Sequence, residues 1–307
     1  MIEFQNVSYT YRTAEGKRAR KKRNEPAEVP ADWGNAPSAY WALHNVSFTL
    51  NDGEFFGIAG HTGSGKSTLT QHMNGLLQPS RGYVLVDGVD ISEKNAATKA
   101  RSHVGVVFQY PEHQLFAATV FEDVAFGPRN MGLSSEEVER RYVEAMKLVE
   151  LDPEQLRDIS PFELSGGQQR RVAFAGVLAM QPKTLILDEP VAGLDPHARE
   201  EFLAFIQRLH HNEGLTVVMV SHDMDDLARF CDRILILNRG EEFALGTPDE
   251  VFADAEACKG IGLGVPAAQH LANTLANEGV ALPAHNGLYT ATELADAIAS
   301  LYEAAHE

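Results

Sequence analysis

The chain has 307 residues, of which 44% are hydrophobic, so it can bury a full core, and disorder of the whole chain is excluded. Its 43 acidic residues outnumber its 26 Lys and Arg, and the net charge of −17 disfavours binding along a nucleic-acid backbone. The longest apolar run, 172–180, is far shorter than the ~18 residues of a membrane-spanning helix. The cysteines, Cys231 and Cys258, lack CxxC and zinc spacing, which favours free thiols in a reducing cytosol over a disulfide.

The first 60 residues predict strands interrupted by an insertion. The N-terminal sequence MIEFQNVSYTY alternates as a strand does, and strands are predicted again at 43–50 and 55–59. Between them, residues 13–38 hold a basic run followed by three prolines, which predicts an exposed insertion. Two roles stay open for this insertion, a solvated loop and a contact with anionic lipid headgroups.

A glycine-rich segment, GHTGSGKS at 60–67, follows a predicted strand and precedes a predicted helix. It fits the pattern G-x-x-x-x-G-K-[ST], and this context disfavours a chance glycine-rich turn. In such a loop the backbone N–H groups converge on phosphates, Lys66 neutralises the β- and γ-phosphates, and the Ser67 hydroxyl holds Mg²⁺. We call this segment the phosphate loop. The predicted ATP-binding residues are Gly60, His61, Thr62, Gly63, Ser64, Gly65, Lys66, Ser67 and Thr68.

The middle of the chain changes from strands to helices and back. Strands are predicted at 83–86 and 104–108, whereas residues 109–182 are mostly helical in pattern. Short apolar strands then alternate with helices, beginning with a strand at 184–187 and a helix at 196–211. This alternation predicts an α/β fold with a mostly parallel core sheet that helices cover on both faces.

A second chemical motif is TLILDEP at 184–190, in which an apolar strand ends at two acids. In a parallel sheet this strand delivers Asp188 beside the phosphate loop, where its carboxylate would bind Mg²⁺ directly or through water. Glu189 is predicted to polarise the attacking water, because an ionised carboxylate can accept a proton. A surface strand end that merely carries two acids is the alternative, which the phosphate loop upstream disfavours.

A third motif, LSGGQQRR at 164–171, narrows the class, and we call it the signature segment. Ser165 is predicted as a helix N-cap with two glycines in the first turn, which creates a second anion-binding helix start. Two such helix starts in separate subdomains cannot easily reach one nucleotide. We therefore expect each to serve a nucleotide that the other copy in a dimer holds. The predicted contacts in trans are Ser165, Gly166, Gly167 and Gln168.

These motifs together resemble the ATP-binding subunits of ABC transporters, over residues 1–247. The resemblance implies that the signature segment contacts the γ-phosphate of ATP on the partner subunit. It also implies a glutamine at Gln109 that senses Mg²⁺ and the membrane subunit, and an aspartate at Asp195 that crosses the dimer interface. His222 matches the switch histidine at the γ-phosphate, with a satisfied structural histidine as the alternative. Tyr11 is at the place of the aromatic that stacks on adenine, although Tyr9 competes for it.

The resemblance also implies the finer organisation of the fold. It is a P-loop NTPase fold with a mostly parallel core sheet, an antiparallel β subdomain, a helical signature subdomain over about 109–182 and a small C-terminal helical segment. The nucleotide-binding domain spans 1–247 and the C-terminal segment 248–307. In that segment two amphipathic helices are predicted from the residue pattern, the second starting with a capping box of Thr290 and Glu293.

A closer similarity is to the ATPases of energy-coupling factor importers for vitamins or metal ions, most of all to the second of their two ATPase types. It rests on QYPEHQLFAATVFEDVAFGPRNMGL at 109–133, HMNGLL at 72–77 and IGLGVP at 261–266. The chain departs from that pattern in its longer insertion at 13–38 and in Val191, where a threonine is usual. Neither departure touches a predicted phosphate ligand.

The similarity implies ATP and Mg²⁺ as cofactors and a peripheral location on the cytoplasmic face of the cell membrane. The implied partners are a second ATPase subunit, with a heterodimer favoured over a homodimer, a transmembrane coupling subunit and a substrate-capture membrane protein. The C-terminal segment would help to hold the two ATPases together. An aromatic set would either form the groove for a helix of the membrane subunit or pack as subdomain core; its members are Tyr110, Phe116, Phe121 and Phe126.

Three other functions compete with this one. The chain could serve another kind of ABC transporter, or it could be a soluble ABC ATPase that acts on DNA or ribosomes. The second is disfavoured by the net charge of −17 and because no coiled-coil insertion or second cassette is present. An assembly module that binds nucleotide without hydrolysis is disfavoured by Glu189 and His222, since losing either is the expected mark of a dead site.

Overall fold

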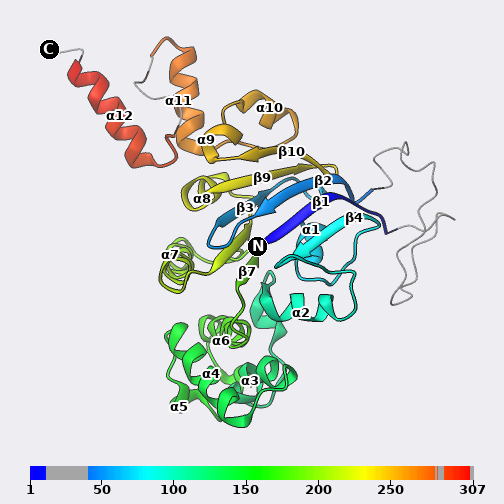
Figure 1. Cartoon of the computed structure of the whole chain (residues 1–307). Coiled ribbons are helices and arrows are strands. Elements are labelled where there is room, and N and C mark those ends of the chain that lie inside the picture. The colour runs from blue at the N-terminus through cyan, green and yellow to red at the C-terminus, as the bar shows by residue number, and fades with distance from the viewer. Residues whose placement is uncertain (12–40, 281, 283–286, 305–307) are drawn as a thin grey trace.

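The computed structural model describes residues 1–11, 41–280, 282 and 287–304, and the predicted insertion at 13–38 lies outside them (Figure 1). The described chain forms two sheets, a group of helices below them in Figure 1 and a C-terminal helical arm above them. Over these residues no helix combines the length and apolar character that crossing a bilayer requires.

The larger sheet has six strands in the order β10-β9-β3-β8-β7-β6. All neighbours pair in parallel except β10, which pairs antiparallel with β9. This confirms the predicted α/β fold with a mostly parallel core sheet. The edge strand β10 was not predicted, because its first residues are exposed and lack an apolar pattern. The strands are β3 (Phe55–Ala59), β6 (Val104–Val107), β7 (Thr184–Asp188), β8 (Thr216–Val220), β9 (Arg233–Asn238) and β10 (Glu241–Gly246).

Alternate residues of the core strands face two different hydrophobic clusters. On β8, Val217 and Met219 join the cluster formed with helices α6, α7 and α8, whereas Val218 joins the cluster on the other face. This follows from the two-residue period of a strand, and it explains why these strands carry apolar side chains on both faces. Full burial of each such side chain contributes about 1.5–3 kcal/mol to the free energy of unfolding.

The second sheet is antiparallel and has the order β2-β1-β4-β5. It packs against one face of the parallel sheet, and the rings of Phe48 and Phe56 stack across that contact with centroids 5.5 Å apart. This sheet corresponds to the antiparallel subdomain that the resemblance implied. Its strands are β1 (Ile2–Tyr9), β2 (Leu43–Leu50), β4 (Arg81–Val86) and β5 (Val89–Asp90).

Four α-helices form the group below the sheets in Figure 1, namely α3 (Val120–Asn130), α4 (Ser135–Leu148), α5 (Pro153–Leu156) and α6 (Gly166–Leu178). Ser134 caps α4 by accepting from the Glu137 backbone N–H at 3.3 Å. The spacing of Ser134 and Glu137 predicts a capping box, which is confirmed only on this side, since the Glu137 carboxylate pairs with Arg140 at 2.6 Å and Arg141 at 2.7 Å. Within the group, Tyr142 is fully buried and its hydroxyl donates to the Pro153 carbonyl at 2.7 Å.

The remaining core helices connect the strands. Helix α1 follows the phosphate loop and α7 follows the predicted interface aspartate, so both begin at residues with an assigned role. Helix α8 begins just after His222. The helices are α1 (Lys66–Met73), α2 (Ala96–His103), α7 (Pro196–Glu213) and α8 (Met224–Phe230).

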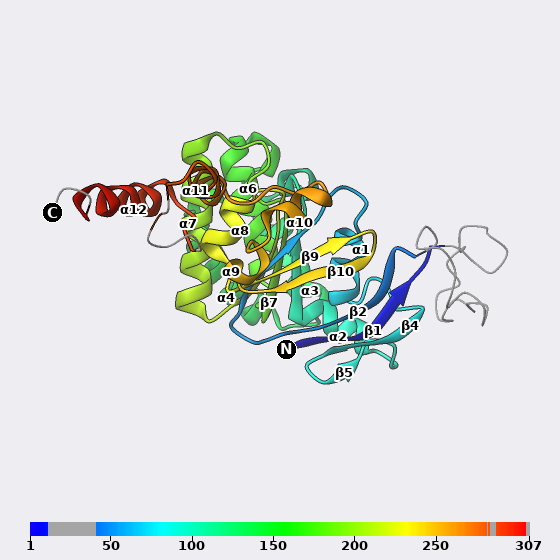
Figure 2. The same ribbon diagram turned by 90° about the horizontal axis from the view of Figure 1, so that it is seen from above.

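The C-terminal part contains α9 (Pro248–Val251), α10 (Ala255–Gly260), α11 (Ala267–Asn277) and α12 (Ala291–Ala304). Side chains of α9 and α10 join the main core, whereas α11 and α12 share a small cluster of their own. Figure 2 shows α12 extending away from the body of the molecule.

Both predicted C-terminal helices are present, but the buried face of the first differs from the prediction. The residue pattern predicts one apolar side through Ala267, Leu271 and Leu275, and of these only Leu275 packs on the small cluster. Ala268 and Ala272 are buried there instead, whereas Leu271 is 47% exposed. The predicted capping box of α12 is confirmed: the Thr290 N–H donates to Glu293 at 2.8 Å and the Glu293 N–H to Thr290 at 3.2 Å.

Candidate functional site

The phosphate loop connects β3 to α1, and two of its glycines are required by its geometry. Gly60 has φ of 148° and Gly65 has φ of 111°. A Cβ on Gly60 would lie 2.4 Å from Ser64 Oγ, and one on Gly65 would lie 2.7 Å from the Ala42 carbonyl. Since real Cβ atoms do not approach other atoms so closely, only glycine allows this tight loop. The turn presents its backbone at the N-terminus of α1, which favours an anion there.

Lys66 lies within this loop. Its buried ammonium donates to the carbonyl of Gly60 at 2.6 Å and to that of His61 at 3.2 Å. Burial lowers the pKa of Lys66, while Glu189 and Asp188 raise it. The side chain is therefore held at the place where the phosphates are predicted, beside the two acids of β7. Thr62 and Gly63, at the tip of the loop, are exposed.

His61 adds a contact that the motif did not indicate. Its Nε2 lies 3.2 Å from the Asn238 side chain at the end of β9, and its Nδ1 lies 2.8 Å from the Thr62 carbonyl. The loop is thus connected to the strand beside β3 as well as to β3 itself.

The two acids follow at the carboxyl end of β7. Asp188 is the last residue of the strand, and burial raises its pKa. Glu189 has φ of 49°, an unfavourable backbone conformation for a residue with a side chain, and its N–H donates to the Val220 carbonyl of β8 at 3.0 Å. Burial, together with the nearby charge of Asp188, raises the pKa of Glu189 to about 7. A carboxylate with a pKa near neutral suits a general base.

His222 follows β8 and lies beside Glu189, with its Nε2 3.2 Å from Glu189 Oε1. Its side chain is 52% exposed, which argues against the alternative of a satisfied core histidine. Burial of the rest of the ring and the charge of Lys66 lower the pKa of His222 from its usual value of 6.5. The ring is therefore neutral at pH 7.

The parallel sheet brings these groups together. In the order β3-β8-β7, the phosphate loop, His222 and the two acids leave the carboxyl ends of three adjacent strands. Gln109 lies two residues beyond β6, the strand next to β7, and its side chain is exposed. Ligands of open α/β sheets bind at this edge.

Three of the oxygen-bearing side chains fit a magnesium ion. Asp188 offers one carboxylate, the Ser67 hydroxyl is exposed at the first turn of α1, and Gln109 offers an amide oxygen. Among the described residues no group of three or more His, Cys, Asp and Glu forms a metal cluster. Proteins hold Mg²⁺ through one or two carboxylates together with substrate phosphates, and the donor chemistry of Asp188, Ser67 and Gln109 is of that kind.

The aromatic candidates for adenine stacking differ in exposure. Tyr11 is exposed and its hydroxyl lies 3.1 Å from Thr68 Oγ1, just after the phosphate loop. Tyr9 packs edge-on against Tyr11 with ring centroids 4.9 Å apart, and burial raises the pKa of Tyr9 to about 12. The more exposed ring is therefore that of Tyr11, which Tyr9 supports, and its stacking on adenine stays a prediction.

The signature segment begins α6. Ser165 caps the helix by accepting from the Gln168 N–H at 3.4 Å, and the Gln168 side chain accepts from the Ser165 N–H at 3.1 Å. Ser165, Gly166 and Gly167 are all exposed. The helix start is therefore open to solvent, with orphan N–H groups that favour an anion.

The two signature glycines are not required by the fold of this chain. A Cβ on Gly166 or Gly167 would meet no atom within 4 Å, and neither residue has a positive φ. Glycine also weakens a helix relative to alanine. The described part of the chain therefore gives no steric reason for glycine at either position.

Arg170, two residues beyond Gln168, connects the signature helix to the catalytic strand. Its guanidinium is buried and donates to the Pro190 carbonyl, directly after Glu189. Burial lowers the pKa of Arg170. Its position in the signature segment was known, but a sequence motif does not indicate which carbonyl a long side chain reaches. Asp195 lies further along as the N-cap of α7, where it accepts from the N–H groups of His197 and Ala198 at 3.0 Å each.

Comparison with known proteins identifies the family. Residues 43–192 match the family model described as ABC transporter. The energy-coupling factor transporter ATP-binding protein EcfA2 of Symbiobacterium thermophilum is 59% identical over 248 residues, which cover 80% of this chain and 85% of that protein. The protein of the same name from Clostridium acetobutylicum is 51% identical over 279 residues, covering 91% and 90% of the two chains.

Solved structures agree with these relatives. CbiO1 of Clostridium perfringens, described as part of the ABC transporter complex CbiONQ, has a TM-score of 0.67 at 35% identity and covers 85% of this chain and 94% of its own. The dimeric ATP-binding cassette MJ0796 bound to ADP and phosphate has a TM-score of 0.63 at 32% identity, covering 80% and 98%. The chain therefore belongs to the ATP-binding subunits of energy-coupling factor transporters within the ABC transporter family, as the sequence motifs predicted.

Proposed function

We propose that this subunit binds ATP with Mg²⁺ and hydrolyses it in a dimer with a second ATPase subunit, preferentially a heterodimer. The energy drives uptake of vitamins or metal ions through a transmembrane coupling subunit and a substrate-capture membrane protein, and the subunit lies on the cytoplasmic face of the membrane. The proposal is supported above all by the signature glycines, which are open to solvent and which the monomer does not need.

In this proposal each chain supplies two unlike halves of an ATP site. One half is the phosphate loop with Lys66 and the acids of β7, and the other is the exposed start of α6. Closure of the dimer gains γ-phosphate contacts that neither chain makes alone, and loss of phosphate removes them, so nucleotide shifts the population between closed and open dimers.

The chemistry is assigned to three groups. Mg²⁺, when bound, would stabilise the charge that develops on the phosphoryl oxygens. Lys66 neutralises the β- and γ-phosphates, and the Glu189 carboxylate takes the proton of the attacking water. His222, 3.2 Å from Glu189, contacts the γ-phosphate and holds that carboxylate in place.

The role of Glu189 predicts a specific pH dependence. The carboxylate accepts a proton only when it is ionised, and its pKa is raised to about 7. ATPase kcat/KM should therefore rise as the pH increases through about 7, whereas the pKa of His222 is lowered from 6.5 by burial and Lys66 and so lies below that rise. The measurement is steady-state phosphate release between pH 5.5 and 9.

Glu189→Gln and Lys66→Ala test the roles assigned to these two side chains in hydrolysis and in nucleotide binding. Glu189→Gln should lose roughly a hundredfold or more of turnover, because a general base contributes on that order, and its residual rate should no longer rise near pH 7. It should still bind a fluorescent ATP analogue, whereas Lys66→Ala should not. Full turnover in Glu189→Gln would refute the proposed base.

The half-site model is tested by placing a carboxylate at the signature segment with Gly166→Glu. The fold should tolerate it, with a free energy of unfolding within ~0.5 kcal/mol of the parent, since the site is open. Binding of the ATP analogue to the single chain should be unchanged. Dimer closure and turnover should fall by about tenfold or more, because the new charge meets the partner's γ-phosphate.

Ser135→Glu is the control for this variant, because it adds the same charge to the exposed first turn of α4 in the same helical group. It should leave closure and turnover unchanged. ATP-induced dimers are measured by light scattering with hydrolysis blocked by Glu189→Gln. Normal closure in Gly166→Glu contradicts the half-site model.

An aromatic surface beyond Gln109 is proposed to receive the membrane subunit. Phe116 is 59% exposed and Phe126 is 49% exposed, and their rings meet edge-on with centroids 4.9 Å apart. Tyr110 is also exposed, whereas Phe121 is covered by Arg157, whose guanidinium lies 4.0 Å from the ring centroid. The docking set is therefore Tyr110, Phe116 and Phe126, and Phe121 serves the core.

Phe126→Asp tests this surface. When the tagged chain is purified from mildly solubilised membranes, the coupling subunit should be lost from Phe126→Asp, because a carboxylate replaces an apolar contact. The second ATPase should remain bound. Mass spectrometry identifies both partners, and full retention of the membrane subunit contradicts the assignment.

The C-terminal arm is proposed as a contact between the two ATPases. Leu271 on α11 and Ile298 on α12 are exposed large apolar side chains on an arm that extends from the body (Figure 2). In the same purification, the double variant Leu271→Asp and Ile298→Asp should lose the second ATPase in the absence of nucleotide while keeping the coupling subunit. Phe126→Asp and this double variant are thus controls for each other. Retention of the second ATPase removes this role from the arm.

A further inference from the structure

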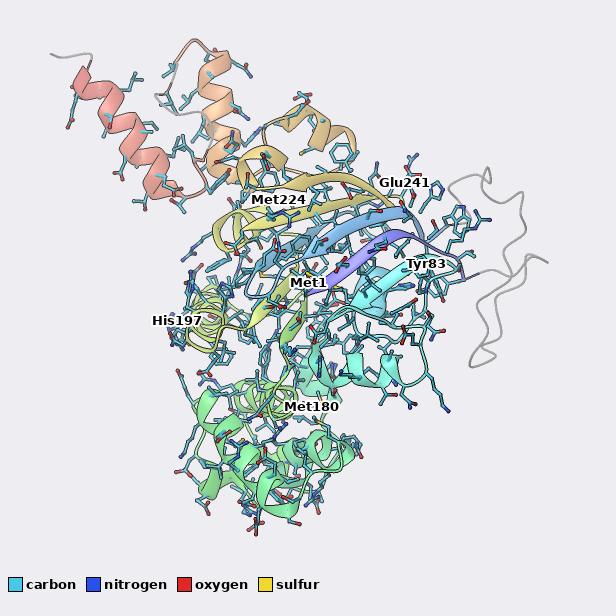
Figure 3. The ribbon with its side chains drawn as sticks, viewed as in Figure 1. Met1, Tyr83, Met180, His197, Met224 and Glu241 are labelled. Atoms are coloured by element: carbon cyan, nitrogen blue, oxygen red, sulfur yellow. The ribbon has the colours of Figure 1, made fainter. Side chains whose placement is uncertain are left out.

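A charged cluster joins helices α7 and α8 next to the site. The Arg199 guanidinium on α7 pairs with Asp226 at 2.7 Å and also with Asp223. Asp226 is buried, and burial raises its pKa while Arg199 opposes that rise. Removing one member of a buried ion pair leaves an uncompensated charge, so the geometry of this cluster is strongly determined. In Figure 3, His197 marks the first turn of α7 and Met224 the first turn of α8.

Asp223, one member of the cluster, contacts residues on both sides of His222. The Asp223 N–H donates to Ser221 Oγ at 3.0 Å, and the Asp223 carboxylate accepts from the N–H groups of Asp225 at 3.0 Å and Asp226 at 3.2 Å. The ring of His222 itself approaches Glu189. The position of His222 therefore depends on where Asp223 and Asp226 are anchored.

Arg199 also contacts the predicted dimer interface. Arg199 lies one helical turn after Asp195, and its N–H donates to the Asp195 carbonyl at 2.9 Å. Asp195 caps the same turn through its side chain. A displacement of Asp195 would therefore be carried by the first turn of α7 to Arg199, and through the ion pairs to the turn that carries His222.

We propose that Arg199 is a positioning residue that couples the Asp195 loop to His222. It holds the turn 221–226 against α7, so that His222 stands beside Glu189 when the interface at Asp195 is engaged. The same turn also holds the C-terminal arm, because the Asp225 carboxylate accepts from the Ala267 N–H at the start of α11 at 2.8 Å. The inference rests on the proposed function, in which His222 acts at the γ-phosphate.

Arg199→Ala tests the coupling in the complex purified from membranes. Its kcat should fall about tenfold, equivalent to ~1.4 kcal/mol, while the Kd for the ATP analogue stays unchanged, because His222 acts after binding. Arg199→Lys should recover part of kcat by restoring the charge without the planar fork. The NMR titration of the His222 ring should also shift in Arg199→Ala, which a purely structural loss elsewhere would not cause.

The chain offers a matched control in Arg229→Ala. Arg229 on α8 pairs with Glu200 on α7 at 2.9 Å, so the variant breaks a second, exposed ion pair between the same two helices. It does not touch the turn that holds His222. Both kcat and the His222 titration should be unchanged.

Stability is separated from positioning by the double variant Arg199→Ala with Asp226→Asn. Neutralising the buried acid should restore the denaturation midpoint without restoring kcat. The inference is overturned if kcat recovers together with the midpoint, or if Arg199→Ala keeps normal kcat and a normal His222 titration. Full turnover of Glu189→Gln would instead overturn the proposed function, so the two failures are distinguishable.

Discussion

The site depends on the parallel register of three central strands. Val220 of β8 is the register partner of both Ile58 on β3 and Asp188 on β7, so the three strands reach the same level of the sheet. Beyond that level the chain continues from β3 into the phosphate loop, from β8 to His222 and from β7 to Glu189. A shift by one residue would turn each side chain into the opposite cluster, where its size and shape would no longer match its close-packed neighbours. The hydrophobic core thereby sets the positions of the charged groups.

The backbone conformation and the burial of these groups cost free energy, and the surrounding fold stabilises them. Glu189 combines a positive φ with a raised pKa, and Lys66 is buried between loop carbonyls and two acids. Backbone strain of this kind costs about 1–3 kcal/mol and persists only where neighbours determine the conformation. Here the neighbour is β8, through the bond from Glu189 to the Val220 carbonyl. A pre-strained, half-desolvated carboxylate is suited to take a proton when substrate arrives.

The parts of the molecule that local patterns determine were predictable. The phosphate loop, the acids at the end of β7 and the Ser165 cap each follow from residues close together in sequence. Features that depend on tertiary packing were not predictable. The edge strand β10 has no apolar pattern. The buried face of α11 is determined by the residues that pack on it. Likewise, the carbonyl that Arg170 reaches is set by how α6 packs beside the chain that follows β7.

Two pairs of glycines differ in whether the fold of the single chain requires them. Gly60 and Gly65 are required by contacts within the loop, because any Cβ would collide with atoms already present. Gly166 and Gly167 have open space around them and ordinary helical backbone, yet they weaken the first turn of α6. In the proposed half-site model these two glycines leave room for a contact from outside the chain. In that model the start of α6 is one half of an ATP site, and the turn that Arg199 holds would connect the other half to the interface.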